Sequence, residues 1–359
     1  MNAARRPGTT RAHPATRALR AWVQPEIFDF WSTRVHPLWT WQRPRARLLE
    51  RLPASRDAVT LILKPNRHWR GLRAGQHVEL GVEIDGRRLI RSYSPTPLPG
   101  GRLAITVKAI EGGRVSRYLA QAPLGAVFEL GQAFGEMVLP DTARGRWLLL
   151  AAGSGITPMR ALLRQLGDAG MPADVDLIYW ARQRDQLCFV DELQALAAVH
   201  PRFRLQLAIT GDAQAPSPRI DRLPLEHVAG LAQAQVLACG PGGFVQAARA
   251  RLQGRVASFQ AEAFTAPVLD DAEDGAVAVT LARSGRVLQL PRGQSLLTAL
   301  EAEGLRPKHG CRMGICNSCA CGKRSGVTRN LLTGAHAAEP GSMLKLCVNS
   351  ASSDLILDL

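Results

Sequence analysis

Apolar and polar positions change their rhythm twice along the chain, and the middle part has the clearest pattern. Residues 147–152 are continuously apolar, as is typical of a buried parallel strand. After a short glycine turn, apolar residues from Met159 to Leu166 recur at the spacing of an amphipathic helix. Further strands are expected at 175–180, 205–209 and 235–239, and a further helix at 189–198. Alternating strands and helices predict an α/β domain with a parallel sheet over residues 143–265.

The preceding segment, residues 43–142, shows short β-runs separated by glycine and proline. The runs cover 58–63, 77–84, 103–107 and 127–130. One helix signal interrupts them near 116–122. Short strands at this spacing predict a small antiparallel barrel or sandwich.

The third pattern follows an acidic stretch at 266–275, which predicts a linker. Two β-runs, 277–281 and 286–290, flank Ser284 and Gly285 and predict a hairpin. A helix is expected at 295–302, where Gly304 ends it. We therefore expect a third, α+β domain over residues 276–359.

Charge singles out the start of the chain. The net charge is +15 over 359 residues, and residues 1–56 hold eleven arginines against three acidic residues. Residues 1–42 also hold four of the seven tryptophans. A segment of this kind can meet nucleic acid, anionic lipid or an acidic partner, or remain a solvated tail. We interpret residues 1–42 as a basic, tryptophan-rich extension.

Composition otherwise indicates a globular protein of the cytoplasm. No stretch approaches 18 consecutive apolar residues, and no apolar segment follows Arg5 and Arg6 as a secretory leader would require. Five of the seven cysteines lie after residue 310. Without a leader, clustered cysteines indicate metal ligands rather than a disulfide framework.

The cysteines follow the pattern C-x4-C-x2-C, with a fourth cysteine 28 positions later. This is the ligand spacing of a plant-type [2Fe–2S] cluster. A zinc site is the alternative, and the four-residue gap and the distant fourth cysteine disfavour it. Residues 276–359 resemble plant-type ferredoxins, which implies a β-grasp fold. The implied ligands are Cys311, Cys316, Cys319 and Cys347.

Two short motifs in the predicted barrel resemble the flavin-binding motifs of the ferredoxin–NADP reductase superfamily. The first is R-x-Y-S, and a G-x-x-S motif follows where a helix is expected to begin. Arginine can pair with a pyrophosphate, and a glycine-rich helix N-terminus can hold phosphate. The resemblance implies an FAD site, in which Ser94 reaches the flavin N5 atom. Its residues are Arg91, Ser92, Tyr93, Ser94, Gly112, Gly113, Val115 and Ser116.

The α/β domain resembles the nicotinamide domain of the same superfamily. Its first turn reads G-x-G-I-T-P, with proline where the ordinary dinucleotide motif has a third glycine. A later strand ends in C-G-P, and the resemblance places Cys239 near the nicotinamide and the flavin. Phe264, in an E-x-F motif, is expected to shield the flavin. The implied nicotinamide-site residues are Gly153, Gly155, Thr157, Pro158, Cys239, Gly240, Pro241 and Phe264.

The choice of nicotinamide depends on the loop after the second strand of this domain. Arg182 and Arg184 can pair with a 2′-phosphate, which favours NADPH, whereas Asp185 favours NADH.

The order of the three domains is that of oxygenase reductases. It implies an oxidoreductase in which NADPH or NADH reduces FAD and the [2Fe–2S] cluster passes single electrons to a terminal oxygenase. A segment at 28–39 resembles extensions on reductases of membrane-bound fatty-acyl desaturases. We therefore expect a desaturase as acceptor and contact of residues 1–42 with the inner membrane face. The alternatives are a soluble ring-hydroxylating or alkane-type oxygenase, and a non-enzymatic iron–sulfur redox sensor.

Overall fold

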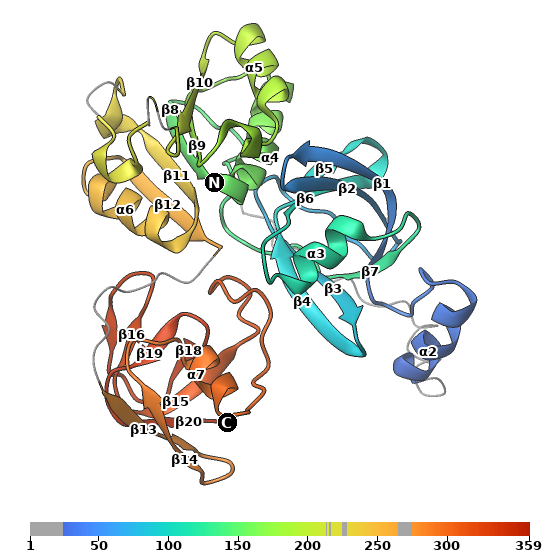
Figure 1. Ribbon diagram of the computed structural model, residues 1–359, viewed down its shortest axis with the longest axis vertical. Coiled ribbons are helices and arrows are strands. Elements are labelled where there is room, and N and C mark those ends of the chain that lie inside the picture. Colours follow the sequence, from blue (N-terminus) through green and yellow to red (C-terminus); the bar gives the residue numbers. More distant parts are fainter. Residues whose placement is uncertain (1–23, 213, 215–216, 225–227, 265–274) are drawn as a thin grey trace, which may run out of the picture.

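The computed structural model describes residues 24–212, 214, 217–224, 228–264 and 275–359. They form three parts that follow one another along the chain, each built on its own main sheet (Figure 1). The predicted linker at 266–275 lies outside the described residues apart from Gly275, as does the start of the N-terminal extension. No described helix is long and apolar enough to cross a membrane.

The first part is a seven-stranded antiparallel sheet in the order β4-β3-β7-β1-β2-β6-β5. It folds around an apolar core, to which Leu61, Leu63, Leu80 and Ile105 contribute from alternate positions of their strands. Helix α3 (Arg114–Gln121) closes one side of this core. The strands are β1 (Arg45–Ser55), β2 (Ala58–Pro65), β3 (Val78–Ile84), β4 (Arg87–Tyr93), β5 (Thr96–Leu98), β6 (Arg102–Lys108) and β7 (Val127–Leu130).

The second part is a five-stranded parallel sheet in the order β10-β9-β8-β11-β12, with helices on both faces. Its central strand β8 is buried along six of its seven residues, as continuous apolar sequence requires. The strands are β8 (Arg146–Ala152), β9 (Asp174–Ala181), β10 (Phe203–Ile209), β11 (Gln235–Gly240) and β12 (Ser258–Ala263). The helices are α4 (Ile156–Asp168), α5 (Val190–Val199) and α6 (Gly242–Leu252).

These two parts share an apolar core. Met137 and Leu139, which follow the antiparallel sheet, are buried in the same cluster as Leu162 of α4. Gly75 lies at this contact, where a Cβ atom would stand 2.0 Å from the carbonyl oxygen of Met137 and 3.0 Å from Leu162. The shared core fixes the relative placement of the two sheets.

The third part has a mixed five-stranded sheet, β14-β13-β20-β15-β18, and a three-stranded sheet, β17-β16-β19. Helix α7 (Leu296–Ala302) packs on it, and the Ser295 side chain caps the helix by accepting from the Thr298 amide. The strands are β13 (Ala276–Leu281), β14 (Val287–Pro291), β15 (Ala320–Ser325), β16 (Thr328–Asn330), β17 (His336–Ala337), β18 (Ser342–Lys345), β19 (Asn349–Ala351) and β20 (Leu355–Leu357).

The described part of the N-terminal extension packs on the first sheet instead of standing apart. Helix α2 (Pro25–Val35) buries Asp29, which accepts a 2.5 Å hydrogen bond from the Trp41 amide and pairs with Arg43 at 3.4 Å. Asn66 and His68 hold the carbonyl groups of Leu38 and Thr40. Polar contacts thus hold residues 24–42 against the seven-stranded sheet, which carries the predicted flavin motif and is called the flavin-type sheet below. The charge pattern alone did not predict these contacts.

Replacing Asp29 by alanine should release this segment. The Trp41 amide would lose its acceptor in a half-buried place, which costs about 1–3 kcal/mol. We expect faster limited proteolysis within residues 24–42, while the three sheets stay folded. Glu26→Ala is the matched control, since Glu26 is an exposed carboxylate on the same helix that meets Arg43 only at 3.9 Å. Equal proteolysis of both variants would contradict the anchoring role of Asp29.

Candidate functional site

The four cysteines of the predicted cluster motif form two pairs. The Sγ atom of Cys311 accepts from the backbone amides of Met313 and Cys316 at 3.3 Å each, and the Sγ atom of Cys316 accepts from the amide of Cys311 at 3.2 Å. The Sγ atoms of Cys319 and Cys347 lie 3.2 Å apart. A [2Fe–2S] cluster needs two thiolates on each of two irons, and this pairing fits that need.

A single-metal site fits the same residues poorly. Among the described residues, no group of three or more His, Cys, Asp or Glu side chains is arranged around one metal position. A hydrogen bond from the Cys311 thiol lowers the pKa of Cys316, and one from the Cys347 thiol lowers the pKa of Cys319. The same hydrogen bonds raise the pKa of Cys311 and Cys347. Each pair therefore supplies one thiolate readily, and metal binding would displace the proton of its second cysteine. The donor set agrees with the iron–sulfur prediction over zinc.

The loop that carries the first three cysteines, residues 310–319, is called the cluster loop below, and two of its residues have unusual backbone conformations. Arg312 and Asn317 have φ values of 59° and 58°, in the left-handed region that side chains other than glycine rarely adopt. The Arg312 guanidinium is held by both carboxylate oxygens of Glu301 on α7. This ion pair offsets the backbone strain and keeps the loop closed around the thiols.

The predicted flavin motif lies at the end of β4 and at the start of α3. Helix α3 has no side-chain cap, so its first amide groups remain available to an anion. A Cβ atom at Gly113 would lie 2.4 Å from the Ser116 Oγ atom, whereas nothing lies within 4 Å of that position at Gly112. The Ser92 Oγ atom is buried with no partner among the described residues. An orphaned hydroxyl and an uncapped helix fit a pyrophosphate-bearing cofactor.

Burial shifts the pKa values of the two large side chains of the flavin motif, Arg91 and Tyr93. Burial lowers the pKa of Arg91, and the Arg312 charge adds to the effect, while burial raises the pKa of Tyr93. Val115 is buried in the core of the flavin-type sheet, so only its backbone amide can face a ligand.

The predicted nicotinamide turn lies between β8 and α4. Gly153 has φ +56° with open space around it, and Gly155 packs so closely on β11 that a Cβ atom would lie 2.0 Å from the Cys239 carbonyl oxygen. Helix α4 also begins without a side-chain cap. Burial, and then the Glu262 carboxyl group, raise the pKa of Cys239, so its sulfur stays protonated. The turn and the C-G-P motif thus meet at the carboxyl ends of adjacent strands, where open α/β sheets bind ligands.

A buried chain of hydrogen bonds runs from the flavin-type sheet to the five-stranded parallel sheet, which carries the predicted nicotinamide motifs and is called the nicotinamide-type sheet below. Ser94 Oγ lies 2.7 Å from His77 Nδ1, and His77 Nε2 bonds the carboxylate of Glu262. All three residues are less than a tenth exposed. The carboxylate can only accept, so Nε2 carries a hydrogen, and in neutral His77 the Nδ1 atom accepts from the Ser94 hydroxyl. The Ser94 oxygen can then accept a hydrogen bond or a proton from a bound group and pass the proton to His77.

Sequence reasoning selected Ser94 for this site but missed His77 and the contact that Glu262 makes. His77 follows Gly75 and Gln76 just before β3 and is one of eight histidines. Nothing in the local pattern separates it from the others, because its partners lie 17 and 185 residues away.

Three further predicted residues lie in the domain of the parallel sheet, two in the loop after β9 and one directly after β12. Arg182 and Arg184 are exposed after β9, and the Arg182 carbonyl oxygen accepts from the Gly211 amide. Phe264 is half-buried against the nicotinamide-type core, and its amide bonds the Gly240 carbonyl. Their predicted contacts with cofactor stay predictions.

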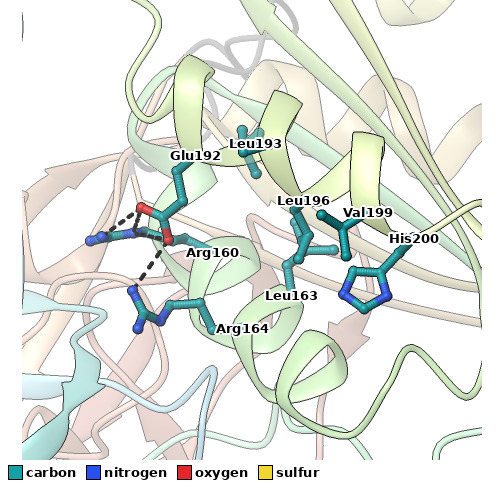
Figure 2. Close-up of a pocket in the computed structure, with 9 residues that line it drawn as sticks. Arg160, Leu163, Arg164, Glu192, Leu193, Leu196, Val199 and His200 are labelled. Atoms are coloured by element: carbon teal, nitrogen blue, oxygen red, sulfur yellow. Dashed lines mark hydrogen bonds and ion pairs between the residues drawn. The ribbon is translucent and has the colours of Figure 1, made fainter.

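A cavity of about 260 Å³ lies between α4 and α5, away from all of these motifs (Figure 2). Arg160 and Arg164 both bind the carboxylate of Glu192 there, and Leu163, Leu196 and Val199 form its apolar side. None of the predicted site residues lines it. Its charges are already paired, so the cavity belongs to the packing of the two helices.

The cluster loop touches the flavin-type sheet through Glu79 on β3. A Cβ atom at Gly310 would lie 1.9 Å from Glu79 Oε1 and 3.0 Å from Cys316 Sγ. Burial and the neighbouring Cys316 raise the pKa of Glu79 to about 7. The cluster loop therefore lies, at Gly310 and Cys316, against β3 of the flavin-type sheet, and the neighbouring strand β4 ends in the flavin motif.

Comparison with protein families gives one match to each part. The family model for an oxidoreductase FAD-binding domain matches residues 45–138, that for an oxidoreductase NAD-binding domain matches 149–250, and that for a 2Fe-2S iron-sulfur cluster binding domain matches 279–348. Phthalate dioxygenase reductase has a similar solved structure, with a TM-score of 0.61 and 25% identity over 88% of this chain and 97% of that one.

Relatives resemble the chain over most of its length. An NADPH oxidoreductase of Mycobacterium tuberculosis is 35% identical over 370 residues, covering 99% of this chain and 96% of the relative. The NADH oxidoreductase HCR of Escherichia coli is 30% identical over 79% of this chain and 88% of its own length. The ferredoxin reductase component of a 3-ketosteroid-9-alpha-monooxygenase of M. tuberculosis is 34% identical over 70% and 74%.

The three sheets and these matches define an electron-transfer flavoprotein with a nicotinamide site and an iron–sulfur domain. The chain belongs to the ferredoxin reductase superfamily, in the group with a C-terminal [2Fe–2S] domain. It is an NAD(P)H-dependent oxidoreductase whose cofactors are FAD and a [2Fe–2S] cluster.

Replacing His77 by glutamine tests the buried chain of hydrogen bonds. The amide can still bond Ser94 and Glu262, but it cannot take up a proton and pass it on. When FAD is bound, its reoxidation would also release a proton, which Ser94 and His77 would take up. We therefore expect ferricyanide turnover with NADPH to fall about 100-fold while FAD stays bound. His336→Gln, at an exposed position of β17, is the control. Unchanged turnover of the His77 variant would contradict a proton-transfer role.

Proposed function

We propose that NADPH delivers hydride beside Ser94 and Cys239, and that Cys311, Cys316, Cys319 and Cys347 hold the cluster that carries single electrons out. The two cysteine pairs, with Cys316 of the first pair beside Glu79 of β3, are the observation that supports this route most strongly. FAD supplies the conversion of a two-electron donor into one-electron steps when it is bound. The chain's own residues position the groups: Arg91 and the α3 amides toward pyrophosphate, and the Gly153 turn toward the nicotinamide.

We infer further that the electrons pass to a terminal oxygenase, and specifically to a membrane-bound fatty-acyl desaturase. The oxygenase class is supported by relatives named as reductase components of a 3-ketosteroid monooxygenase and of glycine betaine monooxygenase. The desaturase is supported by helix α2, whose apolar residues face solvent while its buried residue is Asp29. The exposed residues are Ile27, Phe30, Trp31, Val35 and Trp39, each at least half exposed.

Physical chemistry favours a membrane for this surface. Ile27, Phe30, Trp31, Arg34 and Val35 recur at helical spacing, so they share one face of α2. The Arg34 guanidinium lies 3.5 Å from the centre of the Phe30 ring, which gives the face both apolar and cationic character. Helices with aromatic and basic residues of this kind lie in the interface of anionic bilayers.

NADPH is the proposed donor because of the charges after β9. Arg182 and Arg184 are both exposed and can reach a 2′-phosphate. Asp185, which would favour NADH, pairs with Arg56 at 3.1 Å, and its carbonyl accepts from the Arg56 amide. Arg56 thus neutralises the one acidic residue of the loop. A relative named an NADPH oxidoreductase agrees with this choice.

Replacing Cys347 by serine should separate the two halves of the electron path. We expect cytochrome c reduction to be lost, since the one-electron exit is broken, while NADPH still reduces ferricyanide through the flavin. Cys188→Ser is the control, because Cys188 is buried beside Tyr179 and lies outside the cluster loop. Loss of both activities in Cys347→Ser with FAD still bound would contradict separate hydride and electron sites.

The double change Arg182→Glu and Arg184→Glu should weaken NADPH binding far more than NADH binding. Each lost charge-assisted contact with the 2′-phosphate is worth about 1.5–3 kcal/mol. The measurement is the ratio of kcat/KM for the two donors. Arg219→Glu with Arg222→Glu is a control pair of the same charge change on the same domain. An equal loss for both donors, or a wild-type preference for NADH, would refute the assignment.

Replacing Phe30 and Trp31 by serine tests the membrane proposal. Salt-sensitive binding to vesicles of anionic phospholipid should fall by about tenfold or more, because two aromatic side chains leave the apolar face. NADPH-driven cytochrome c reduction in solution should be unaffected, since these residues touch no cofactor motif. Val287→Ser, an exposed apolar residue of the third part, is the control. Unchanged vesicle binding would remove the support for a membrane-bound acceptor and favour a soluble oxygenase.

A further inference from the structure

Glu79 is the acidic side chain that the flavin-type sheet presents to the cluster loop. Its neighbours on β3, Val78 and Leu80, are fully buried in the barrel core. Because side chains alternate along a strand, Glu79 points to the opposite face. That face meets Gly310, the residue directly before the first cysteine of the motif.

Close packing holds the Glu79 carboxylate beside the thiol of Cys316. An ideal Cβ atom on Gly310 would lie within 3.0 Å of both Cys316 Sγ and the carboxyl carbon of Glu79. Gly131 supports the other side, where a Cβ atom would lie 3.1 Å from that of Glu79. Glycine at both positions leaves room for the carboxylate to reach the loop in this position.

The carboxylate is half-buried and only partly compensated, by a hydrogen bond from the Ser318 side chain and by one nearby cation. Its Oε1 atom is buried and finds no hydrogen-bond donor among the described residues. Arg88 is the cation that acts on it, and the Arg88 guanidinium is itself bound to Glu129 at 2.6 Å. A half-buried carboxylate held beside a thiol is less well solvated than a surface carboxylate, and we expect it to have a functional use.

We propose that Glu79 is a positioning residue whose charge lowers the affinity of the docked cluster for an electron. The inference rests on the proposed role of Cys316 as a ligand. Net charge and hydrogen bonds around the sulfurs set the potential of such a cluster. An electron that enters the cluster adds one negative charge beside Glu79.

The same interaction weakens the contact once the electron has arrived. If the contact disfavours the reduced form, then reduction disfavours the contact by the same factor, because the two effects are one coupling free energy. Reduction thus loosens the loop from β3 at the moment when the cluster must face an outside acceptor. Separation then removes Glu79 from the cluster and disfavours return of the electron to the flavin.

The test is the midpoint potential of the cluster in the full-length holoenzyme, measured by redox titration with EPR detection. For Glu79→Gln we expect a positive shift that corresponds to about a tenfold change in the electron equilibrium, or about 59 mV for a one-electron couple. Glu83→Gln is the matched control, since Glu83 lies on the same strand and the same face but is exposed to solvent. It should leave the potential unchanged. Equal shifts in both variants, or none in Glu79→Gln, would overturn the proposal.

A second variant keeps the test decisive if Glu79→Gln does not assemble. Arg88→Gln removes the partial compensation and should shift the potential in the negative direction, opposite to Glu79→Gln. No shift, or a positive one, would contradict the electrostatic role. Absence of an iron–sulfur signal in the wild-type protein would instead refute the ligand assignment, so the two failures are distinguishable.

Discussion

One buried hydrogen bond, between His77 and Glu262, connects the antiparallel sheet that carries the flavin motif to the parallel sheet that carries the nicotinamide motifs. His77 precedes the third strand of the flavin-type sheet, and Glu262 ends the last strand of the parallel sheet. Neither group can be left unpaired in this place without a cost of about 1–3 kcal/mol or more, so the bond requires the two domains to close on each other. The shared apolar core around Met137 and Leu162 satisfies that requirement.

Close approach of backbones is the second condition for the site. Gly155 touches Cys239, and Gly310 touches Glu79, so one glycine joins strands within the nicotinamide-type sheet and the other joins the cluster loop to the flavin-type sheet. A side chain at Gly155 would push the turn away from the Cys239 backbone, and one at Gly310 would displace the Glu79 carboxylate. The route that we propose runs from the nicotinamide turn, past Ser94, to the cluster loop beside Glu79 on β3.

Sequence reasoning reached the fold through features that are local. The continuous apolar run of β8, the helical spacing of α4 and the hairpin at Ser284 and Gly285 each appear within a few residues, and the structure confirms these elements. It missed β1, because the charged residues of this strand break the alternation that marks a strand. It also missed the hydrogen bond between Glu262 and His77 and the contact of Glu79 with the cluster loop. Those depend on contacts between distant segments, and a buried polar residue carries no local sign of its partner.

The central claim is that one chain takes hydride from NADPH and holds three electrons, two on FAD and one on a [2Fe–2S] cluster. An anaerobic titration of the purified protein with NADPH, followed by flavin absorbance and by EPR, measures this directly. The account predicts complete reduction at about 1.5 equivalents of NADPH per chain, together with the EPR signal of a reduced [2Fe–2S] cluster. Complete flavin bleaching at about 1 equivalent with no iron–sulfur signal would contradict it.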